Sequence, residues 1–446
     1  MALTGIQIYK LLPHTNCKEC GFPTCLAFAM KLAAKQVELA ACPYVSAESK
    51  AQLAESAAPP IRLITLKSDG YEVKAGNEVV LYRHDKTYYN RPGLFVRVQD
   101  SETPQSISEK VSKADGYKVS YVGMDITVDG FAVEAITGDT GKFTSAIQAV
   151  RGKSKRPIIL ITSDPGLAES GLKALPSENP MLCGANVNNW EAFAELAKQN
   201  QASLVVTGNS LEEMADLTQK IKDKGFEDLV LGPVNNKLSG LLAMNTQIRR
   251  LALKNFRQLG YPTLALPCNA GDKAVEINQA VQAITKYAGF IVLGDFCPED
   301  IYPLLVLRQN IYTDPQKPIQ VTPGLYEINS PKPESPVLVT TNFSITYFSV
   351  ANEVESSGLP AWLLVADAEG MSVLTAWAAG KFDAERIAKA VKSFNVVDKV
   401  SRKVIVLPGH VAVLSGDLEE ELAGWEIRVG PREAVDLPTY MKQALN

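Results

Sequence analysis

Four cysteines near the N-terminus carry the clearest chemical signal in the sequence. They are Cys17, Cys20, Cys25 and Cys42. Their C-x2-C-x4-C-x16-C spacing places three thiols within nine residues, and four thiolates suit either an iron–sulfur cluster or structural zinc. Iron is favoured because no histidine completes the set, because Pro43 follows the fourth cysteine, and because the apolar stretch Leu26–Leu32 can shield a cluster from water. Zinc remains the alternative on spacing alone.

The remaining reactive side chains do not assemble a catalytic group. Cys183, Cys268 and Cys297 are isolated, and no histidine lies between His84 and His410. Polar residues do follow several expected strands, as active-site residues of barrel enzymes do, but solvated loops and helix caps use the same residue types. These polar residues are Asp164, Asn186, Asn188, Asn269 and Asp295. The centre of the sequence therefore predicts no catalytic site.

Two proline-rich breaks divide the chain, whose 446 residues are many for a single hydrophobic core. The first break, Ser56–Pro60, cannot continue a helix and is typical of a linker, and the second is Pro331–Pro336. We therefore expect three domains. They are a cysteine module at 1–57, a linker and central domain at 58–325, and a C-terminal domain at 326–446.

Repeated βα units are expected to fill the central domain. A hairpin comes first, from Tyr71–Lys74 and Glu78–Arg83 around the turn residues 75–77. Short apolar runs then alternate with amphipathic stretches such as Leu211–Lys224 and Gln247–Leu259. The expected strands are Leu94–Val98, Val119–Val122, Ala132–Ile136, Ile158–Thr162, Leu204–Thr207, Leu229–Leu231, Thr263–Leu266 and Ile291–Leu293. Eight units predict a (β/α)8 TIM-type barrel, with an open doubly wound sheet as the alternative.

The C-terminal domain is predicted to be a small Rossmann-like α/β fold, so the whole chain is of the α/β class. Its buried parallel strands are expected at Val337–Thr341, Trp362–Ala366, Val404–Leu407 and Glu426–Val429. Its helices are expected at Ile345–Val354, Ser372–Phe394, Asp417–Leu422 and Thr439–Leu445. Ligands of such sheets bind outside the carboxyl ends of the strands, which directs attention to the loops there.

Composition excludes several classes of protein. Hydrophobic residues make up 46% and charged residues 21%, and the net charge of -4 gives no general attraction to nucleic acid or to an anionic membrane. The first residues lack the pattern of a signal peptide, and no apolar stretch reaches the ~20 residues of a membrane span. The spacing of the cysteines does not resemble a secreted disulfide framework. We therefore expect a cytoplasmic protein that binds neither nucleic acid nor membrane.

The cysteine segment resembles that of a known family. The run Leu12–Ala29, with the continuation Cys42-Pro43-Tyr44, is similar to the 4Fe-4S segment of corrinoid iron–sulfur proteins. The resemblance extends over the whole chain and its three-part order, and it is specific to the large (gamma) subunit found with the acetyl-CoA decarbonylase/synthase complex. It implies a 4Fe-4S cluster on Cys17, Cys20, Cys25 and Cys42 and a corrinoid of the cobalamin type in the C-terminal domain.

The resemblance also implies the function of a methyl carrier in the reductive acetyl-CoA (Wood-Ljungdahl) pathway. A Co(I) corrinoid would accept methyl from methyltetrahydrofolate through a separate methyltransferase and deliver it to the nickel site of acetyl-CoA synthase. The 4Fe-4S cluster would reduce Co(II) whenever the carrier is oxidised. Further implied partners are a small subunit that forms a heterodimer with this chain and a low-potential electron donor. The chain itself would then need separate enzymes for both transfers.

The same resemblance directs the choice of corrinoid contacts to the loops of the C-terminal domain. The preferred residues are Thr340, Thr346, Gly370, Met371, Ser372, Val373 and Asp436, and the supporting residues are Asn342, Thr375 and Gly430. The D-x-H-x-x-G motif that supplies a cobalt-ligating histidine in other cobalamin proteins is absent, since Pro408 and not aspartate lies two positions before His410. The implied cofactor state is therefore base-off, without a protein histidine on cobalt.

Two other functions are alternatives. The central domain could itself be a barrel methyltransferase that binds the pterin, in which case the purified chain alone would turn over. The chain could also be an electron-transfer or scaffold subunit that carries only the cluster. A cobalt-free preparation that still supports a partner's activity would favour this second alternative.

Overall fold

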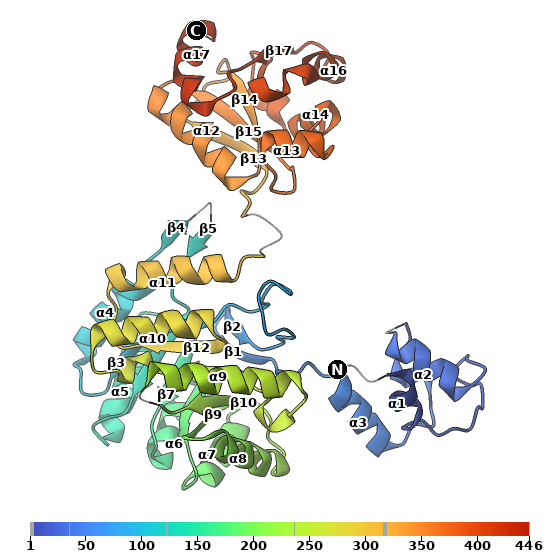
Figure 1. Ribbon diagram of the computed structural model, residues 1–446. Coiled ribbons are helices and arrows are strands. Elements are labelled where there is room, and N and C mark those ends of the chain that lie inside the picture. Colours follow the sequence, from blue (N-terminus) through green and yellow to red (C-terminus); the bar gives the residue numbers. More distant parts are fainter. Residues whose placement is uncertain (1–3, 35, 122–123, 236, 315–318, 446) are drawn as a thin grey trace. The chain divides into compact units, whose positions relative to one another are not determined.

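The computed structural model describes residues 4–34, 36–121, 124–235, 237–314 and 319–445. The chain forms two compact units, one of Met1–Tyr117 with Thr127–Tyr312 and one of Lys118–Ile126 with Thr313–Asn446. The first unit contains an N-terminal helical module and a barrel, and the second contains an open sheet (Figure 1). No helix among the described residues is both long and apolar enough to cross a membrane.

Short helices form the N-terminal module. They are α1 (Gly5–Tyr9), α2 (Cys25–Ala33), the 3-10 turn η1 (Leu39–Ala41) and α3 (Ala47–Ala57). Thr4 and Gln7 cap α1 reciprocally, and Thr24 Oγ1 accepts from Ala27 N at the start of α2. The expected apolar shield at Leu26–Leu32 is only partly correct. The helix buries Phe28 but leaves Met30 48% exposed, because a single helix presents both faces of such a run.

In the described part of the chain, eight parallel strands close into a barrel, which confirms the expected central fold. In chain order they are β3 (Gly93–Gln99), β6 (Gly130–Glu134), β7 (Ile158–Ile161), β8 (Met181–Ala185), β9 (Ser203–Gly208), β10 (Leu229–Pro233), β11 (Thr263–Ala265) and β12 (Ala288–Leu293). The outer helices are α4 (Pro104–Gly116), α5 (Thr140–Arg151), α6 (Pro165–Lys173), α7 (Trp190–Gln199), α8 (Leu211–Asp223), α9 (Leu238–Leu253), α10 (Lys273–Thr285) and α11 (Pro298–Ile311). Several begin at a Thr, Asp or Ser whose side chain accepts a backbone N–H of the first turn.

The hairpin before the barrel lies earlier in the chain than the sequence pattern predicts. β1 (Ile64–Ser68) pairs with β2 (Tyr71–Ala75), and 78–83 forms no strand. Asp69 and Gly70 both have positive φ, the conformation that a tight two-residue turn requires and that Asp-Gly supplies readily. The hairpin shares a core with the inward-facing barrel residues. A Cβ on Gly93 would lie 2.8 Å from Val73 Cγ1, so the hairpin covers the amino ends of the strands.

The expected number of eight barrel strands is correct, although one expected strand is not in the barrel and one barrel strand was not expected. β8 is a barrel strand that the pattern misses, because Gly184 interrupts the apolar run, and a Cβ there would collide with the carbonyl of Thr162. The expected strand Val119–Val122 is not part of the barrel. β4 (Val119–Tyr121) instead pairs antiparallel with β5 (Met124–Ile126) in a separate hairpin, and Val122 lies outside the described residues.

The C-terminal sheet has the order β13-β15-β14-β16-β17. β14 (Val337–Thr341), β15 (Ala361–Ala366), β16 (Val404–Leu407) and β17 (Glu426–Val429) are parallel, as expected. The antiparallel edge strand β13 (Gly324–Ile328) was not predicted, and it crosses the boundary expected at 325/326. Residues before it also belong to this fold, since Val321 N donates to Asn342 O at 2.9 Å.

Breaks in two expected helices come from residues with positive φ. The stretch 372–394 is two helices, because Gly380 adopts a φ of 65° and Asp383 then caps a new helix. The stretch 247–259 is also wrong as a single helix, since Asn255, with a φ of 64°, separates α9 from the 3-10 turn η2 (Arg257–Leu259). The C-terminal helices are α12 (Ser344–Ser357), α13 (Val373–Ala378), α14 (Ala384–Ser393), α15 (Val396–Lys399), α16 (Ser415–Glu421) and α17 (Leu437–Ala444).

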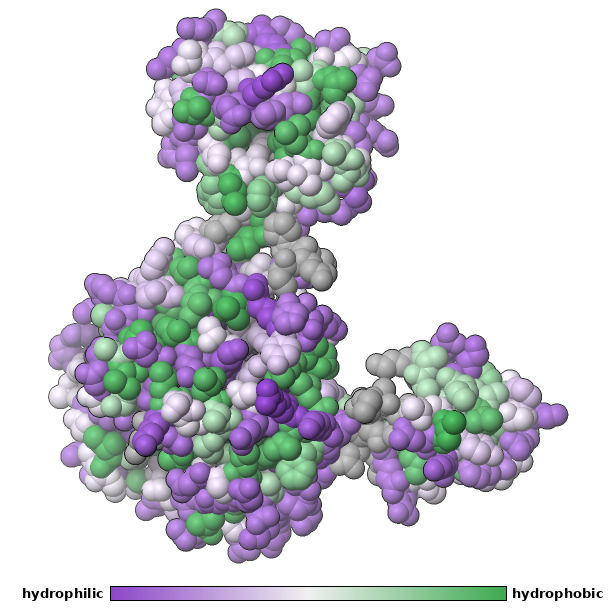
Figure 2. Space-filling view, viewed as in Figure 1, coloured by the Kyte–Doolittle hydropathy of each residue, from purple (hydrophilic) through white to green (hydrophobic). Residues whose placement is uncertain are grey.

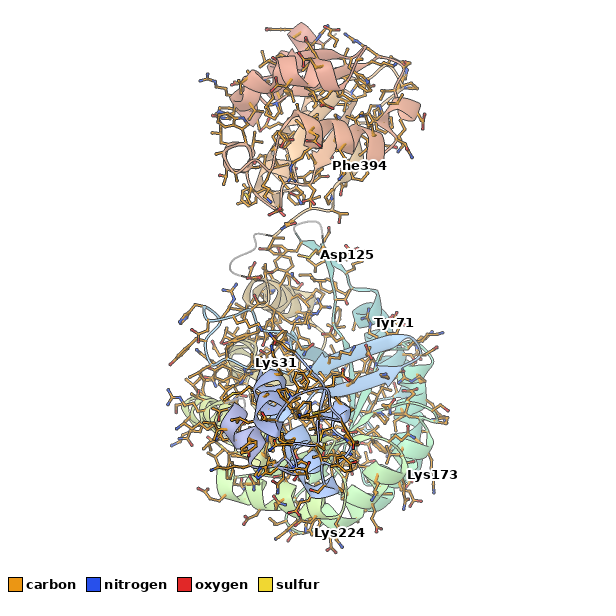
Figure 3. The ribbon with its side chains drawn as sticks, turned by 90° about the vertical axis from the view of Figure 1, so that its right-hand side faces the viewer. Lys31, Tyr71, Asp125, Lys173, Lys224 and Phe394 are labelled. Atoms are coloured by element: carbon orange, nitrogen blue, oxygen red, sulfur yellow. The ribbon has the colours of Figure 1, made fainter. Side chains whose placement is uncertain are left out.

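Charged side chains occupy the outside of the barrel unit. Lys173 and Lys224, at the carboxyl ends of α6 and α8, lie at the outer edge of the helical layer in Figure 3, where a cation offsets the helix dipole. Hydrophobic and hydrophilic residues alternate on the face that carries α9 and α10 (Figure 2). The outer helices nevertheless bury apolar side chains, such as Ile248 of α9 and Ile284 of α10.

Candidate functional site

Left-handed residues shape the loop that carries the first cysteines. His14, Asn16, Lys18 and Gly21 have φ values of 59°, 50°, 68° and 81°. Turns of this kind direct successive backbone N–H groups to one side and form the concave anion sites found around iron–sulfur clusters. Asn16 Oδ1 accepts from Cys25 N at 2.8 Å, so the loop is tied to the start of α2.

The four cysteines of the N-terminal module differ in solvent exposure. Cys25 and Cys42 are buried in the core of the module, Cys20 is half-buried against that core, and Cys17 is exposed. All four are free thiols. A cluster held by them would be covered by protein on the side of Phe28 and reachable on the side of Cys17.

A side-chain hydrogen bond joins the fourth cysteine's segment to this loop. Tyr44, two residues after Cys42, donates its hydroxyl to Glu19 Oε1 at 2.8 Å. The bond to the Glu19 carboxylate raises the pKa of the Tyr44 phenol, and the neighbouring Cys17 and Cys42 add to this effect. The sequence-distant Cys42 is therefore held beside the Cys17–Cys20 loop.

Among the described residues, no three His, Cys, Asp or Glu side chains gather closely enough to hold a single metal ion. In a four-iron cluster each thiolate binds a different iron, so the sulfurs stand farther apart than the ligands of one ion. The donor set of four free thiols in one small module, three of them close in sequence to a loop with left-handed residues, fits such a cluster.

A second candidate site lies where the strand order of the C-terminal sheet reverses. The chain leaves β14 for β15 on one side and then crosses to β16 on the other side, which makes the carboxyl end of β14 the switch point. A cavity of about 320 Å³ opens there. Its walls come from β14, β16, the first turns of α12 and α13, and the loop after β17. Ligands of open α/β sheets bind at this place.

One buried hydroxyl in this cavity lacks a partner. Thr340, at the end of β14, is fully buried and lines the cavity, yet its Oγ1 makes no hydrogen bond. An unpaired buried hydroxyl costs about 1–3 kcal/mol, so a ligand that pairs with it would recover that cost. Ile345 and Leu374 give the rim exposed apolar surface, 69% and 46% exposed, and Arg432 and Glu433 give it exposed charged groups. The lining therefore fits a cofactor with an apolar body and a polar periphery.

Glycines allow two loops to meet at the edge of the cavity. Gly409 N donates to Pro431 O at 3.0 Å, and a Cβ on Gly409 would lie 2.5 Å from Gly430 O. A Cβ on Gly430 would lie 2.9 Å from Val406 Cγ1. These contacts fix the loop after β17 against the loop after β16.

Two family models match different parts of the chain. The family model described as "CO dehydrogenase/acetyl-CoA synthase delta subunit" matches residues 63–441, and a model for an Fe-S cluster matches residues 12–44, which contain all four cysteines. The large subunit of the corrinoid/iron-sulfur protein of Moorella thermoacetica is 44% identical over 446 residues, with 100% of both chains covered. This chain belongs to the family of corrinoid/iron-sulfur protein large subunits.

Archaeal members of the corrinoid/iron-sulfur family match over nearly the same length. The acetyl-CoA decarbonylase/synthase complex subunit gamma of Methanopyrus kandleri is 33% identical, covering 99% of this chain and 98% of its own. That of Archaeoglobus fulgidus is 33% identical, covering 98% and 97%. These full-length relatives confirm the expected assignment to the gamma subunit. A solved dihydropteroate synthase from Vibrio fischeri overlays 56% of this chain and 100% of its own, at 15% identity and a TM-score of 0.38.

In this corrinoid/iron-sulfur family member, five of the ten expected corrinoid contacts line the cavity. They are Thr340, Thr346, Ser372, Val373 and Gly430. The other five do not line it. Asn342 is buried and accepts from Ala368 N and Gly370 N, while Gly370 itself has a φ of 73° and packs on Gln320, so both shape the loop before α13. The remaining three are Met371, packed against the domain core, Thr375, hydrogen-bonded to Ser372, and exposed Asp436, at the start of α17.

Helix faces supply lining residues that the loop-based reasoning missed. Ile345, Ser349 and Val350 line the cavity from α12, and Leu437 lines it from α17. The spacing of three to four residues along α12 was the available signal, since such positions share one face of a helix. His410 also lines the cavity, with Nε2 3.7 Å from Glu433 Oε1, although it lies outside any D-x-H-x-x-G motif.

Two cysteines of the barrel core are unsuited to nucleophilic chemistry. Cys183 and Cys268 are buried in the barrel core, and burial raises the pKa of each thiol to about 12. Such thiols remain protonated at neutral pH and are poor nucleophiles. Asp164, one of the polar residues noted at strand ends, caps α6 by accepting from Gly166 N and Leu167 N.

Alkylation of the metal-free chain at pH 8 is expected to separate the two groups of cysteines. Iodoacetamide should modify exposed Cys17 first, whereas Cys183 and Cys268 should react only after denaturation, because burial shields both thiols and raises their pKa. Mass spectrometry of the digested protein reads out each site. Modification of native Cys268 at the rate of Cys17 would contradict the burial that we describe.

Proposed function

We propose that this chain carries methyl groups for acetyl-CoA synthesis in the reductive acetyl-CoA (Wood-Ljungdahl) pathway. The observation that carries the proposal is the full-length match to the Moorella corrinoid/iron-sulfur protein large subunit. When bound, the corrinoid supplies the cobalt that accepts and releases methyl, and the 4Fe-4S cluster supplies the electron that restores oxidised cobalt. We propose domain boundaries near 57 and 312, the second placed before β13 because that strand pairs with β15.

The chain's own residues would hold these groups in separate places. Cys17, Cys20, Cys25 and Cys42 would be the thiolate ligands of the cluster. The Thr340 hydroxyl would pair with the corrinoid periphery, while Ile345 and Leu374 would cover its apolar ring. We retain Asn342, Gly370, Met371, Thr375 and Asp436 as residues that shape or flank the corrinoid site, together with Thr346, Ser372, Val373 and Gly430 in its lining.

The proposed partners follow from the complexes to which the relatives belong and from the chemistry of the transfers. A small subunit would pair with this chain, and acetyl-CoA synthase would receive the methyl group. A methyltetrahydrofolate methyltransferase would supply the methyl group, and a low-potential electron donor would feed the cluster. The gamma-subunit names of the relatives support membership of such a complex.

Spectroscopy of the anaerobically purified chain tests this function. We expect one corrinoid and about four irons per chain, with the EPR signal of base-off Co(II). Because His410 lines the cavity, coupling of the cobalt signal to a histidine nitrogen that disappears in His410→Ala would contradict the base-off state. A chain that binds iron but no cobalt would instead support the electron-transfer alternative, and methyl transfer by the chain alone would support the methyltransferase alternative.

A further inference from the structure

The barrel contains a cavity that the methyl-carrier function does not use. It has a volume of about 430 Å³ and lies at the carboxyl ends of β10 and β11, under α9 and α10. Its place is the face of a barrel where small molecules bind in barrel enzymes. This barrel cavity shares no lining residue with the cavity at the end of β14, and none of its lining residues belongs to the N-terminal module.

A gap in the barrel wall produces this cavity. β10 pairs with β9 over five residues, from Leu229 to Pro233, but with β11 only at Leu231, opposite Thr263. β11 is also short, and its register with β12 shifts between Thr263 and Leu264. The strands therefore separate beyond Leu231, and helix side chains, not a continuous sheet, form the wall of the cavity.

The lining is neutral and rich in side-chain amides. In the part of the chain that the structure describes, no ionisable side chain lines the cavity. Leu241, Leu264 and Val275 contribute apolar surface. The amides are Asn235, Asn245, Asn269, Gln279 and Gln282. Free anions and cations would find no opposite charge there, and the nearby Arg97 is already paired with Glu134 at 3.0 Å.

Three of these five amides already have a hydrogen-bond partner, whereas the oxygen of Asn245 has none. Asn235 Oδ1 accepts from Lys237 N, Asn269 Oδ1 accepts from Arg97 Nη1, and Gln282 Nε2 donates to Leu238 O. Asn245, in the middle of α9, is only 5% exposed, and its Oδ1 has no hydrogen-bond partner. A buried amide without a partner is costly unless something else fills its hydrogen-bonding capacity.

We propose that this cavity binds an uncharged, planar nitrogen heterocycle with a lactam edge. An amide side chain presents one acceptor and two donors, the complement of a lactam C=O beside an N–H, and Asn and Gln recognise base edges in this bidentate manner. The apolar walls would cover the ring faces. The site goes beyond the methyl-carrier function and can be tested whether or not that function holds.

Binding to the full-length holoprotein tests the site. Probes are uracil, hypoxanthine and 2-amino-4-oxopteridine, which share the lactam and differ in ring size, with benzoate as a flat anionic control. We expect calorimetry and saturation-transfer NMR to detect at least one lactam at a Kd below about 1 mM, and benzoate not at all. Failure of all three lactams to bind, or equal binding of benzoate, would overturn the proposal.

Three variants locate the binding. Asn245→Leu should weaken it at least about tenfold, and Val275→Trp should block the entrance, since Val275 is 43% exposed and tolerates a large side chain. Asn278→Leu is the matched control on exposed α10 surface, where Asn278 Nδ2 donates only to Ala274 O, and it should bind as wild type. Unchanged affinity in both Asn245→Leu and Val275→Trp would place the ligand elsewhere and overturn the proposal.

Discussion

Cys25→Ser is expected to remove the cluster from the purified protein, lowering iron from about four per chain to near zero. Cys25 is buried at the start of α2, and its backbone is fixed by Asn16, so no other thiol can take its place. Corrinoid content should stay unchanged, because the proposed corrinoid cavity lies in the other unit of the chain. Methyl transfer should then require a chemical reductant in place of the protein electron donor. Iron analysis and the EPR spectrum of the reduced cluster measure the effect.

Cys297→Ser is the matched control for this change. Cys297 is a half-buried thiol outside the N-terminal module, where its Sγ donates to Glu299 Oε2 at 3.0 Å. This variant should retain all of its iron. If Cys25→Ser kept four irons per chain, Cys25 would not be a ligand. Loss of iron in both variants would show that the signal reports general instability and not ligation.

Thr340→Val is expected to act in opposite directions on stability and on cofactor binding. The Thr340 hydroxyl is buried without a partner, so its removal should raise the free energy of unfolding of the cofactor-free chain by about 1 kcal/mol. The same hydroxyl lines the C-terminal cavity, so its loss should weaken corrinoid binding about tenfold. Denaturant unfolding and corrinoid titration measure the two effects.

Thr341→Val separates these two effects within one strand. Thr341 is equally buried and its Oγ1 is also unpaired, but it does not line the cavity, because alternate residues of β14 face opposite sides of the sheet. This variant should be stabilised in the same way and bind corrinoid like wild type. Equal losses of affinity in both variants would show that Thr340 is not a specific corrinoid contact. Unchanged affinity in Thr340→Val would show the same.

The cysteine pattern and the hydrophobic periodicity determined much of this protein before any contact was known. Ligand spacing is local, so Cys17, Cys20 and Cys25 could be recognised within one loop, and buried parallel strands such as β14 and β16 appear as short apolar runs. Two of the failed expectations involve glycine. Gly184 interrupts the apolar run of β8, so this strand was missed, and Gly380 ends a helix that was expected to continue. A single glycine can change the backbone while the hydrophobic pattern of its neighbours stays the same.

Only the tertiary structure decided which side chains share a cavity. The sequence favoured Thr340 as a corrinoid contact and offered Asn342 in support, but only the structure shows that Thr340 lines the cavity while Asn342 accepts from backbone N–H groups of the next loop. The sequence also contained no sign of the gap between β10 and β11, since strand pairing depends on residues far apart in the chain. Ligand types are thus set by local sequence, while cavities and unpaired groups such as Asn245 Oδ1 arise from long-range packing.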